Sequence, residues 1–315
     1  MQKISVWFAA ARLRTLPLSI SGIIVGNGLA WIEGTFSVMI FILALLTTTA
    51  FQILSNFAND YGDGVKGTDN DQRLGPKRVL QQGLLSRAEL KRGIQVTAGI
   101  SMLLALTLIY LAFGCADWGK ALFFIALGLA SIIAAIKYTV GDSAYGYYAL
   151  GDLFVFLFFG GVSVLGSYYL QTQLLPLSLI LPAASIGLFS TAVLNLNNLR
   201  DMDNDRTSNK LTVPLLLGYN KGRIYHSFLV ITAFVLSSIY AFLNAESIFS
   251  YLFLLLFLPL GNHLIRVSKS KGGKSLDPEL KVVALSTFFF AMIFILGFYI
   301  ARFHGQAKFD FDMPL

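Results

Sequence analysis

Asparagine and aspartate side chains recur at helical spacing in two parts of the chain. The first cluster is spaced by four and three positions and the second by four and four: Asn56, Asp60 and Asp63, then Asn197, Asp201 and Asp205. Residues at such spacings share one face of a helix, where like charges repel. A run of unpaired carboxylates therefore indicates a bound cation. Oxygen ligands without nearby His or Cys suit Mg²⁺, which binds one or two carboxylates together with substrate phosphates.

Basic residues follow both clusters, as a site that also binds phosphate oxygens requires. The candidates for diphosphate binding are Lys66, Arg73, Lys77 and Arg78 after the first cluster and Lys210 after the second. Asp69 is a further candidate metal ligand. We therefore predict a magnesium–diphosphate site. The alternative is that both clusters are solvated loop residues at a membrane edge.

The two clusters resemble each other in their arrangement along the chain. Asp60 and Asp201 lie 141 residues apart, and each is preceded by Asn at i−4 and followed by basic residues. This repetition predicts an internal pseudo-repeat of about four spans, whose halves face one another and pool their carboxylates.

The amino-acid composition indicates that the chain lies in a membrane. Of its 315 residues 56% are hydrophobic and 13% charged, against roughly a quarter charged in soluble domains. We therefore expect an all-α membrane protein. The net charge of +7 does not indicate nucleic-acid binding, because the basic residues are divided among short loops. The single cysteine, Cys115, excludes an internal disulfide or a multi-cysteine metal site.

Apolar runs long enough to cross about 30 Å of hydrocarbon predict a bundle of nine transmembrane helices. Their approximate ranges are 13–31, 36–55, 94–113, 120–137, 150–170, 174–194, 226–243, 248–265 and 282–301. We expect two four-helix halves plus a ninth helix, in one polytopic domain over residues 1–315.

The positions of Lys and Arg predict the orientation, because these residues concentrate in cytoplasmic loops. With nine spans, 21 of the 24 basic residues fall on one face, so we expect a cytoplasmic N terminus and an outer C terminus. A cleavable signal peptide is not expected, because Arg12 and Arg14 interrupt the first apolar run. Two aspartate-rich cytoplasmic loops, at about 56–92 and 195–225, would form the active site.

Several segments resemble the UbiA-type intramembrane aromatic prenyltransferases, and within them the menaquinone branch. The resembling segments are residues 11–17, 52–69, 138–141 with 151–152, and 191–218. Two departures from the usual pattern favour the naphthoate branch over the 4-hydroxybenzoate branch. Position 64 is Gly, so the second carboxylate of the first motif is Asp63, and Tyr138 is followed at i+4 by Asp142 instead of Lys.

The resemblance implies transfer of a polyprenyl group from an allylic polyprenyl diphosphate to 1,4-dihydroxy-2-naphthoate, with release of diphosphate and CO₂ and with Mg²⁺ as cofactor. Arg14 is then a candidate partner for the acceptor carboxylate, or else a positive-inside anchor. Tyr138 is a candidate to contact the allylic cation. Asp152 either assists deprotonation of the acceptor or caps its helix. The isoprenoid tail requires an apolar tunnel open to lipid. The resemblance to the menaquinone branch also implies a location in a bacterial inner membrane.

Two alternatives remain at this point. The same scaffold can serve another aromatic acceptor, such as 4-hydroxybenzoate, haem or a chlorophyllide. A secondary transporter is a more remote alternative, because transporters place ionisable groups near the bilayer midplane instead of at one face. His226, His263 and His304 lie far apart without ligand spacing, so no histidine metal site is expected. Asn262 and His263 either line the cavity or are polar residues at a helix end whose hydrogen bonds are made within the protein. No nucleic acid and no obligate protein partner are expected.

Overall fold

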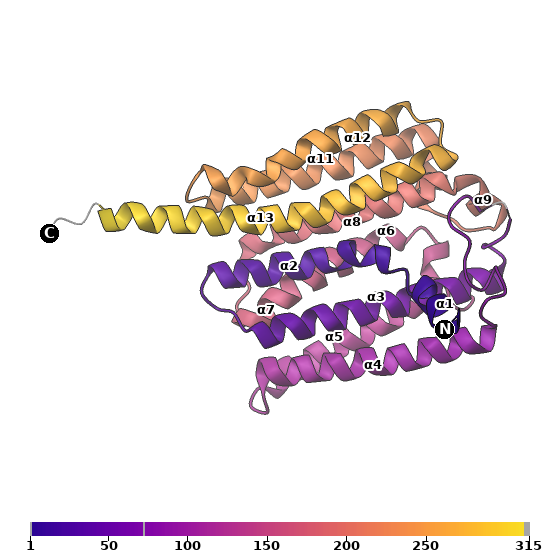
Figure 1. Ribbon diagram of the computed structural model, residues 1–315, viewed down its shortest axis with the longest axis horizontal. Coiled ribbons are helices and arrows are strands. Elements are labelled where there is room, and N and C mark those ends of the chain that lie inside the picture. Colours follow the sequence, from indigo (N-terminus) through magenta and orange to yellow (C-terminus); the bar gives the residue numbers. More distant parts are fainter. Residues whose placement is uncertain (1, 72, 312–315) are drawn as a thin grey trace.

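The computed structural model describes residues 2–71 and 73–311, and its described elements are helical apart from one isolated β-bridge (Figure 1). Within these residues nine helical runs are long and apolar enough to cross a membrane, which confirms the predicted number of spans. The first run consists of α1 (Gln2–Ala11), η1 (Leu13–Thr15) and α2 (Leu16–Ile32).

The other spans follow in chain order, and several combine two or three helical segments. They are α3 (Val38–Lys66); α4 (Arg87–Phe113); α5 (Trp118–Lys137); α6 (Gly151–Val155) with η3 (Phe156–Gly166) and α7 (Ser167–Thr172); η4 (Leu177–Leu179) with α8 (Ile180–Arg200); α11 (Tyr219–Asn244); η5 (Ile248–Leu256) with α12 (Phe257–Lys269); and η6 (Gly273–Leu276) with α13 (Asp277–Phe311). Short helices occupy the connections: η2 (Tyr145–Tyr147), α9 (Met202–Thr207) and α10 (Val213–Leu217).

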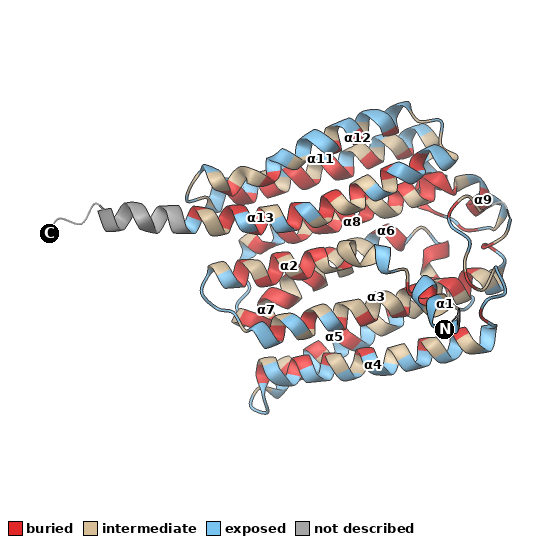
Figure 2. Cartoon of the chain, viewed as in Figure 1, coloured by how far each residue is buried: buried red, intermediate tan, exposed pale blue. Residues whose placement is uncertain are grey.

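Figure 1 shows α4 and α5 at one side of the bundle and α11 and α12 at the other, with α2, α3, α8 and α13 between them. The burial of the spans agrees with this order. In the apolar part of the span that contains α8, 56% of the residues are buried, against 17% in α5, so α8 is central and α5 faces lipid (Figure 2). The largest apolar core joins α2, η3, α8, α11 and α13.

The central helices approach closely where small residues meet. A Cβ built on Gly160 of η3 would lie 2.4 Å from the carbonyl oxygen of Ala183 on α8. Close backbone contact of this kind is common between membrane helices, because apolar side chains gain little by leaving lipid for protein. The segment η3 is a π-helix, a form often found at functional sites.

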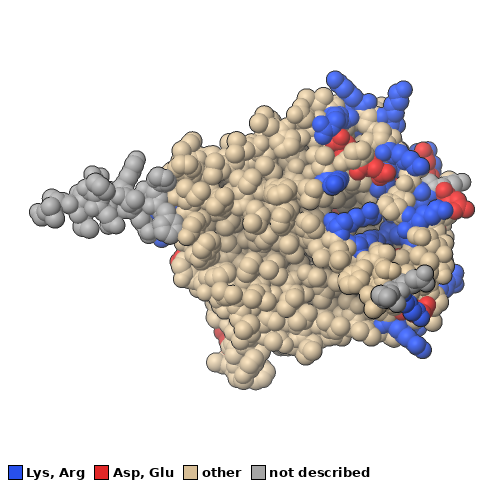
Figure 3. Space-filling view, viewed as in Figure 1, with Lys and Arg blue, Asp and Glu red and all other residues tan. Residues whose placement is uncertain are grey.

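Lys and Arg side chains gather at one end of the bundle, while most of the remaining visible surface shows neither basic nor acidic side chains (Figure 3). We call this the charged end. It contains the connection from α3 to α4, the connection from α5 to α6, and the connection from α8 through α9 and α10 to α11. Large hydrophobic side chains are exposed along the spans, such as Leu103 of α4, Leu122 of α5 and Phe228 of α11, as contact with lipid requires.

Candidate active site

The first Asn–Asp cluster lies on the last turns of α3, which extends past the predicted membrane edge at residue 55 to Lys66. The helix includes Asn56, Asp60 and Asp63, which confirms the helical arrangement predicted for them, and all three are buried. The helix ends at Gly67, whose φ of 76° is left-handed, and the backbone amides of Thr68 and Asp69 return to the carbonyl oxygen of Asp63. This turn brings the Asp69 side chain back toward the helix end.

The first two residues of the cluster bind other parts of the protein. The amide nitrogen of Asn56 donates to the carbonyl oxygen of Ala11 at 2.8 Å and to Oγ1 of Thr15 at 3.1 Å. The carboxylate of Asp60 accepts hydrogen bonds from the backbone amides of Val79 and Leu80, each at 3.3 Å. These contacts fasten α1 and the loop after α3 to the end of α3.

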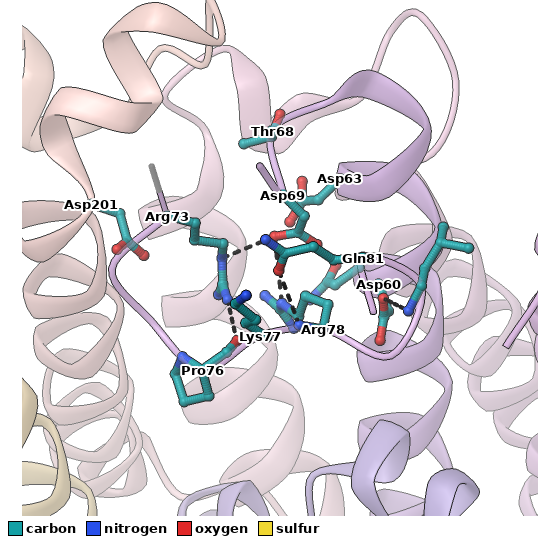
Figure 4. Close-up of polar contacts among 12 residues, drawn as sticks. Asp60, Asp63, Thr68, Asp69, Arg73, Pro76, Lys77, Arg78, Gln81 and Asp201 are labelled. Atoms are coloured by element: carbon teal, nitrogen blue, oxygen red, sulfur yellow. Dashed lines mark hydrogen bonds and ion pairs between the residues drawn. The ribbon is translucent and has the colours of Figure 1, made fainter. Parts of the chain in front are cut away.

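Asp69 lies beside Asp63 and faces two arginines from the same loop (Figure 4). Its Oδ1 is 2.9 Å from Nε of Arg73 and 3.6 Å from Nε of Arg78, while no hydrogen-bond partner is found for its buried Oδ2 among the described residues. Burial raises the pKa of Asp69 to about 7, and the Asp63 carboxylate adds to the rise. A carboxylate in this position favours a further cation.

The second cluster differs from the single helix that its spacing predicts. The helix α8 ends at Arg200, and Asp201, with φ −94° and ψ 12°, is the junction to the short helix α9. Asp201 is also paired, contrary to the prediction of an unpaired row: the Arg200 guanidinium binds its carboxylate and, through Nη2, the amide oxygen of Asn197 at 2.9 Å. Spacing alone did not predict the ion pair, because the Arg200 side chain can fold back onto the carboxylate of the next residue, Asp201.

Asp205 completes the second cluster and faces the first. No hydrogen-bond partner is found within the described residues for its buried Oδ2 or for Oδ1 of Asn204. Burial raises the pKa of Asp205 to about 7; Lys210 opposes the shift, and the carboxylates of Asp201 and Asp63 support it. The amide nitrogen of Asn204 donates to the carbonyl oxygen of Thr68 at 2.9 Å, which ties the two aspartate loops together.

The predicted diphosphate-binding residues do not all have the same setting. Lys210 is buried, and its Nζ lies 3.9 Å from Oδ1 of Asp63. Burial lowers the pKa of Lys210, but the carboxylates of Asp63 and Asp205 raise it by more, so its ammonium form is favoured. Arg73, Arg78 and Lys66 are partly buried around the same carboxylates, whereas Lys77 is exposed in the loop.

The oxygen ligands at this end fit Mg²⁺ better than a metal that requires a complete protein cage. Within the residues described, no three His, Cys, Asp or Glu side chains converge closely enough to hold a metal alone. The partnerless oxygens of Asp69, Asn204 and Asp205 are carboxylate and amide oxygens. Mg²⁺ typically takes only one or two such carboxylates and fills its remaining positions with phosphate and water.

An apolar cavity of about 330 Å³ lies between α2, α3, α4, α5 and η3. Near the charged end it is lined by Asn59, Tyr138 and Tyr145, and farther into the bundle by aromatic and aliphatic side chains. An aromatic row forms part of the wall: the Tyr145 ring stacks on Phe154 at 4.0 Å between centroids and meets Tyr138 edge to face at 5.4 Å.

The remaining predicted residues lie around the site. Arg14 is exposed in η1. Asp152 lies in the first turn of α6 and accepts a hydrogen bond from the Tyr225 hydroxyl at 3.1 Å. The N-cap of α6 is Leu150, so Asp152 is not the N-cap residue of its helix.

Two of the histidines meet in the structure although they lie 37 positions apart in the chain. Nε2 of His226 and Nε2 of His263 are 2.8 Å apart, because α11 and α12 pack side by side, and Nδ1 of His263 lies 2.6 Å from Glu279. Asn262 is exposed, and neither it nor His263 lines the cavity. The side chain of His304 lies outside the described residues.

Four further residues at this end were missed from the sequence: Arg12, which donates to the carbonyl oxygen of Asn56 at 3.3 Å, and Tyr147, Arg200 and Asn204. Arg200 and Asn204 had a signal as polar residues within the second cluster, and Arg12 lies in the resembling segment 11–17. Nothing local distinguishes Tyr147 among the tyrosines of the connection from α5 to α6.

Comparison with known sequences identifies relatives along nearly the whole chain. The model described as the UbiA prenyltransferase family matches residues 19–277. The 1,4-dihydroxy-2-naphthoate octaprenyltransferase of Escherichia coli K12 is 40% identical over 302 residues, covering 96% of this chain and 97% of that protein. The enzyme of the same name from Mycobacterium tuberculosis is 34% identical over 295 residues, covering 93% and 96%.

Solved structures share the fold at low sequence identity. The apo structure of a UbiA homolog from Aeropyrum pernix K1 is similar with a TM-score of 0.66 and 16% identity, covering 90% of this chain and 98% of that one. The structure of a UbiA homolog from Archaeoglobus fulgidus bound to GPP and Mg²⁺ has a TM-score of 0.61 and 15% identity, covering 92% and 99%.

Proposed function

The chain belongs to the UbiA prenyltransferase family, and on that premise we propose that it transfers the polyprenyl group of an allylic polyprenyl diphosphate to 1,4-dihydroxy-2-naphthoate. Diphosphate and CO₂ leave, and the reaction serves menaquinone biosynthesis. The observation that carries this proposal is the 40% identity with a 1,4-dihydroxy-2-naphthoate octaprenyltransferase over nearly the full length of both chains.

The charged end supplies the diphosphate site in this proposal. Asp69 and Asp205 are the most direct candidates to hold Mg²⁺, because each keeps a buried carboxylate oxygen without a partner within the part of the chain that the structure describes. The other candidate ligands share their polar groups with protein partners: Asn56, Asp60, Asp63, Asn197 and Asp201. When bound, Mg²⁺ would neutralise the charge that develops on the diphosphate leaving group.

The basic residues and the cavity bind the two parts of the donor. Arg73, Arg78, Lys66 and Lys210 surround the carboxylates and are suited to bind phosphate oxygens, while exposed Lys77 is less well placed. The apolar cavity lies beside this site and is suited to bind the first isoprene units and to exclude water from the allylic carbon. The ring of Tyr138, in the cavity wall, is positioned to stabilise positive charge there.

Two further residues are assigned to the acceptor. Arg14, near the charged end of α2, is suited to pair with the carboxylate of 1,4-dihydroxy-2-naphthoate. Asp152 is suited to accept a proton from an acceptor hydroxyl, with the Tyr225 hydroxyl fixing one of its oxygens.

We further propose that the charged end faces the cytoplasm of a bacterial inner membrane, with the N terminus inside and the C terminus outside. The distribution of 21 of 24 basic residues on one side of the nine spans supports this orientation. The whole chain would form one domain of two pseudo-repeated halves plus a ninth helix. The ends of α3 and α8, the second and sixth spans, each contribute an Asn–Asp cluster, which supports the repeat.

The test is product formation by the purified protein in nanodiscs with 1,4-dihydroxy-2-naphthoate, an allylic polyprenyl diphosphate and Mg²⁺. Parallel reactions contain 4-hydroxybenzoate or EDTA. A prenylated, decarboxylated naphthoquinol, detected as its quinone after oxidation by air, supports the proposal if it disappears with EDTA. Prenylated hydroxybenzoate alone would overturn the acceptor, and no product from either acceptor would overturn the transferase function.

A further inference from the structure

Tyr147, in the connection between α5 and α6, contacts both aspartate loops and is 8% exposed. We propose that it is a positioning residue for the diphosphate site, whose hydroxyl orients the Asp63 carboxylate and whose ring positions the ammonium groups of Lys66 and Lys210. This inference rests on the proposed function, because it assigns a role within the same site.

The hydroxyl group of Tyr147 has a defined hydrogen-bond direction. It donates to Oδ1 of Asp63 at 2.7 Å, and it lies 2.7 Å from Oγ1 of Thr68. A tyrosine hydroxyl has one proton, so when that proton goes to Asp63 the Thr68 hydroxyl must be the donor to Tyr147. The chain of donors therefore runs from Thr68 through Tyr147 to Asp63. It directs Oδ1 of Asp63 toward Tyr147 and leaves Oδ2 as the oxygen available to a cation.

The ring of Tyr147 contacts two of the proposed phosphate-binding cations. Nζ of Lys66 lies over the ring at 3.8 Å from its centroid, and Nζ of Lys210 lies over it at 5.4 Å. A cation within about 6 Å of an aromatic centroid is attracted by the ring. Long lysine side chains otherwise sample many rotamers, and holding them reduces the entropy lost when they bind an anion.

The backbone of Tyr147 is itself fixed to the second aspartate loop. The amide of Leu211 donates to the carbonyl oxygen of Tyr147 at 3.2 Å, and the amide of Ala149 donates to the carbonyl oxygen of Leu211 at 2.9 Å. The side chain thus contacts the first loop while the backbone is bonded to the second. Tyr147 is therefore placed to set the position of Asp63 relative to Asp205 and Lys210.

The neighbouring tyrosine provides a matched control. Tyr148 is 58% exposed, and its hydroxyl donates to the carbonyl oxygen of Asp142 at 3.4 Å, away from the carboxylates. Tyr148→Phe removes the same atom from the same connection without changing the bond to Asp63.

The experiment compares wild type, Tyr147→Phe and Tyr148→Phe in nanodiscs. Binding of geranyl thiolodiphosphate, an analogue that ionises poorly, is measured by calorimetry across a Mg²⁺ titration without any acceptor. Tyr147→Phe is expected to raise both the analogue Kd and the half-saturating Mg²⁺ concentration by about tenfold or more. This factor corresponds to the free energy of one hydrogen bond to a charged group. Tyr148→Phe is expected to bind like wild type, and both variants should keep the wild-type melting temperature within a few degrees.

Kinetics separate positioning from a purely structural role. Tyr147→Phe should raise KM for the prenyl diphosphate while leaving KM for the naphthoate unchanged, and Tyr147→Leu should weaken donor binding further because it also removes the ring. Thr68→Val, which removes the donor to Tyr147, should shift the same constants in the same direction by a smaller factor.

The outcomes are distinguishable. Wild-type binding constants in Tyr147→Phe would overturn the assignment, as would a lowered melting temperature with unchanged affinity. If Tyr147→Phe fails to fold, Thr68→Val decides, and wild-type constants in that variant would also overturn the assignment. Absence of prenylated naphthoquinol product from the wild type would refute the proposed function alone, since the binding measurement needs no acceptor.

Discussion

The guanidinium of Arg200 binds the carboxylate of Asp201 through two hydrogen bonds, from Nε to Oδ1 at 2.9 Å and from Nη2 to Oδ2 at 2.5 Å. Its Nη1 donates to Oδ1 of Asp277 in the first turn of α13 at 3.0 Å. Arg200 therefore connects the second aspartate cluster to the last span. A planar guanidinium can make these contacts together, whereas an ammonium group cannot reproduce the paired geometry.

We predict that Arg200→Lys lowers kcat/KM for the prenyl diphosphate by about tenfold or more, because Asp201 loses its bidentate partner while the positive charge remains. The measurement is steady-state turnover in nanodiscs. Arg206→Lys is the control, since Arg206 is an exposed arginine of the neighbouring helix α9. Equal activity of the two variants would show that the geometry of the Arg200 pair does not matter for turnover.

A second prediction concerns the carboxylate of Asp205. Asp205→Asn should lower kcat by about 100-fold or more, because it removes a buried charge placed to bind the cation that stabilises the leaving group. Asp203→Asn removes an exposed carboxylate two residues earlier and should retain wild-type turnover. Folding of each variant is checked by a monodisperse size-exclusion peak in detergent and by a wild-type melting temperature. A fully active Asp205→Asn variant would exclude Asp205 as a metal ligand.

Much of the fold follows from the sequence because the bilayer imposes a length and a composition on every span. The nine apolar runs correspond to the nine candidate spans of the described chain. The extension of α3 to Lys66 was also accessible, since Asn56, Asp60 and Asp63 keep a helical period beyond the apolar run. The short segments that break the spans, such as the π-helix η3, have no comparable signal in hydropathy.

The contacts between the loops were not accessible, because they depend on how distant elements pack. Tyr147 meets Asp63 across 84 positions, and His226 meets His263 across 37. The pairing of Arg200 with Asp201 was missed for a different reason. Helical spacing was assumed to continue through residue 205, whereas α8 ends at Arg200 and lets its side chain fold back.

A third prediction tests the close contact between η3 and α8. Gly160→Ala places a methyl group 2.4 Å from the carbonyl oxygen of Ala183, so the helices must separate, at a cost of about 1–3 kcal/mol in the free energy of unfolding. Gly161→Ala is the control, because a Cβ there meets no described atom within 4 Å. Thermal unfolding in one detergent should show a lower melting temperature for Gly160→Ala only. Equal melting temperatures would contradict the observed packing.

The last prediction concerns the apolar cavity and the length of the prenyl donor. Gly128 of α5 lines the cavity, and a Cβ at this position lies 3.7 Å from Cβ of Ala105, an ordinary contact. Gly128→Phe therefore adds a ring to the cavity wall without an immediate backbone clash. If the cavity holds the isoprenoid chain, this ring should exclude distal isoprene units while leaving room for the first ones. We expect kcat/KM for octaprenyl diphosphate to fall by about tenfold or more, because losing one methylene contact in an apolar pocket costs roughly 1–3 kcal/mol of binding free energy. The value for geranyl diphosphate should change little.

The matched control for Gly128→Phe is Gly99→Phe, because Gly99 on α4 is exposed and a Cβ at this position meets no atom of the described residues within 4 Å. It adds the same ring to the lipid-facing surface and should leave the preference between the two donors unchanged. The ratio of kcat/KM for the two donors is the decisive quantity, because a general loss of stability lowers both values together. An unchanged ratio in Gly128→Phe, at a wild-type melting temperature, would place the isoprenoid chain outside this cavity, along the lipid-facing surface of the bundle.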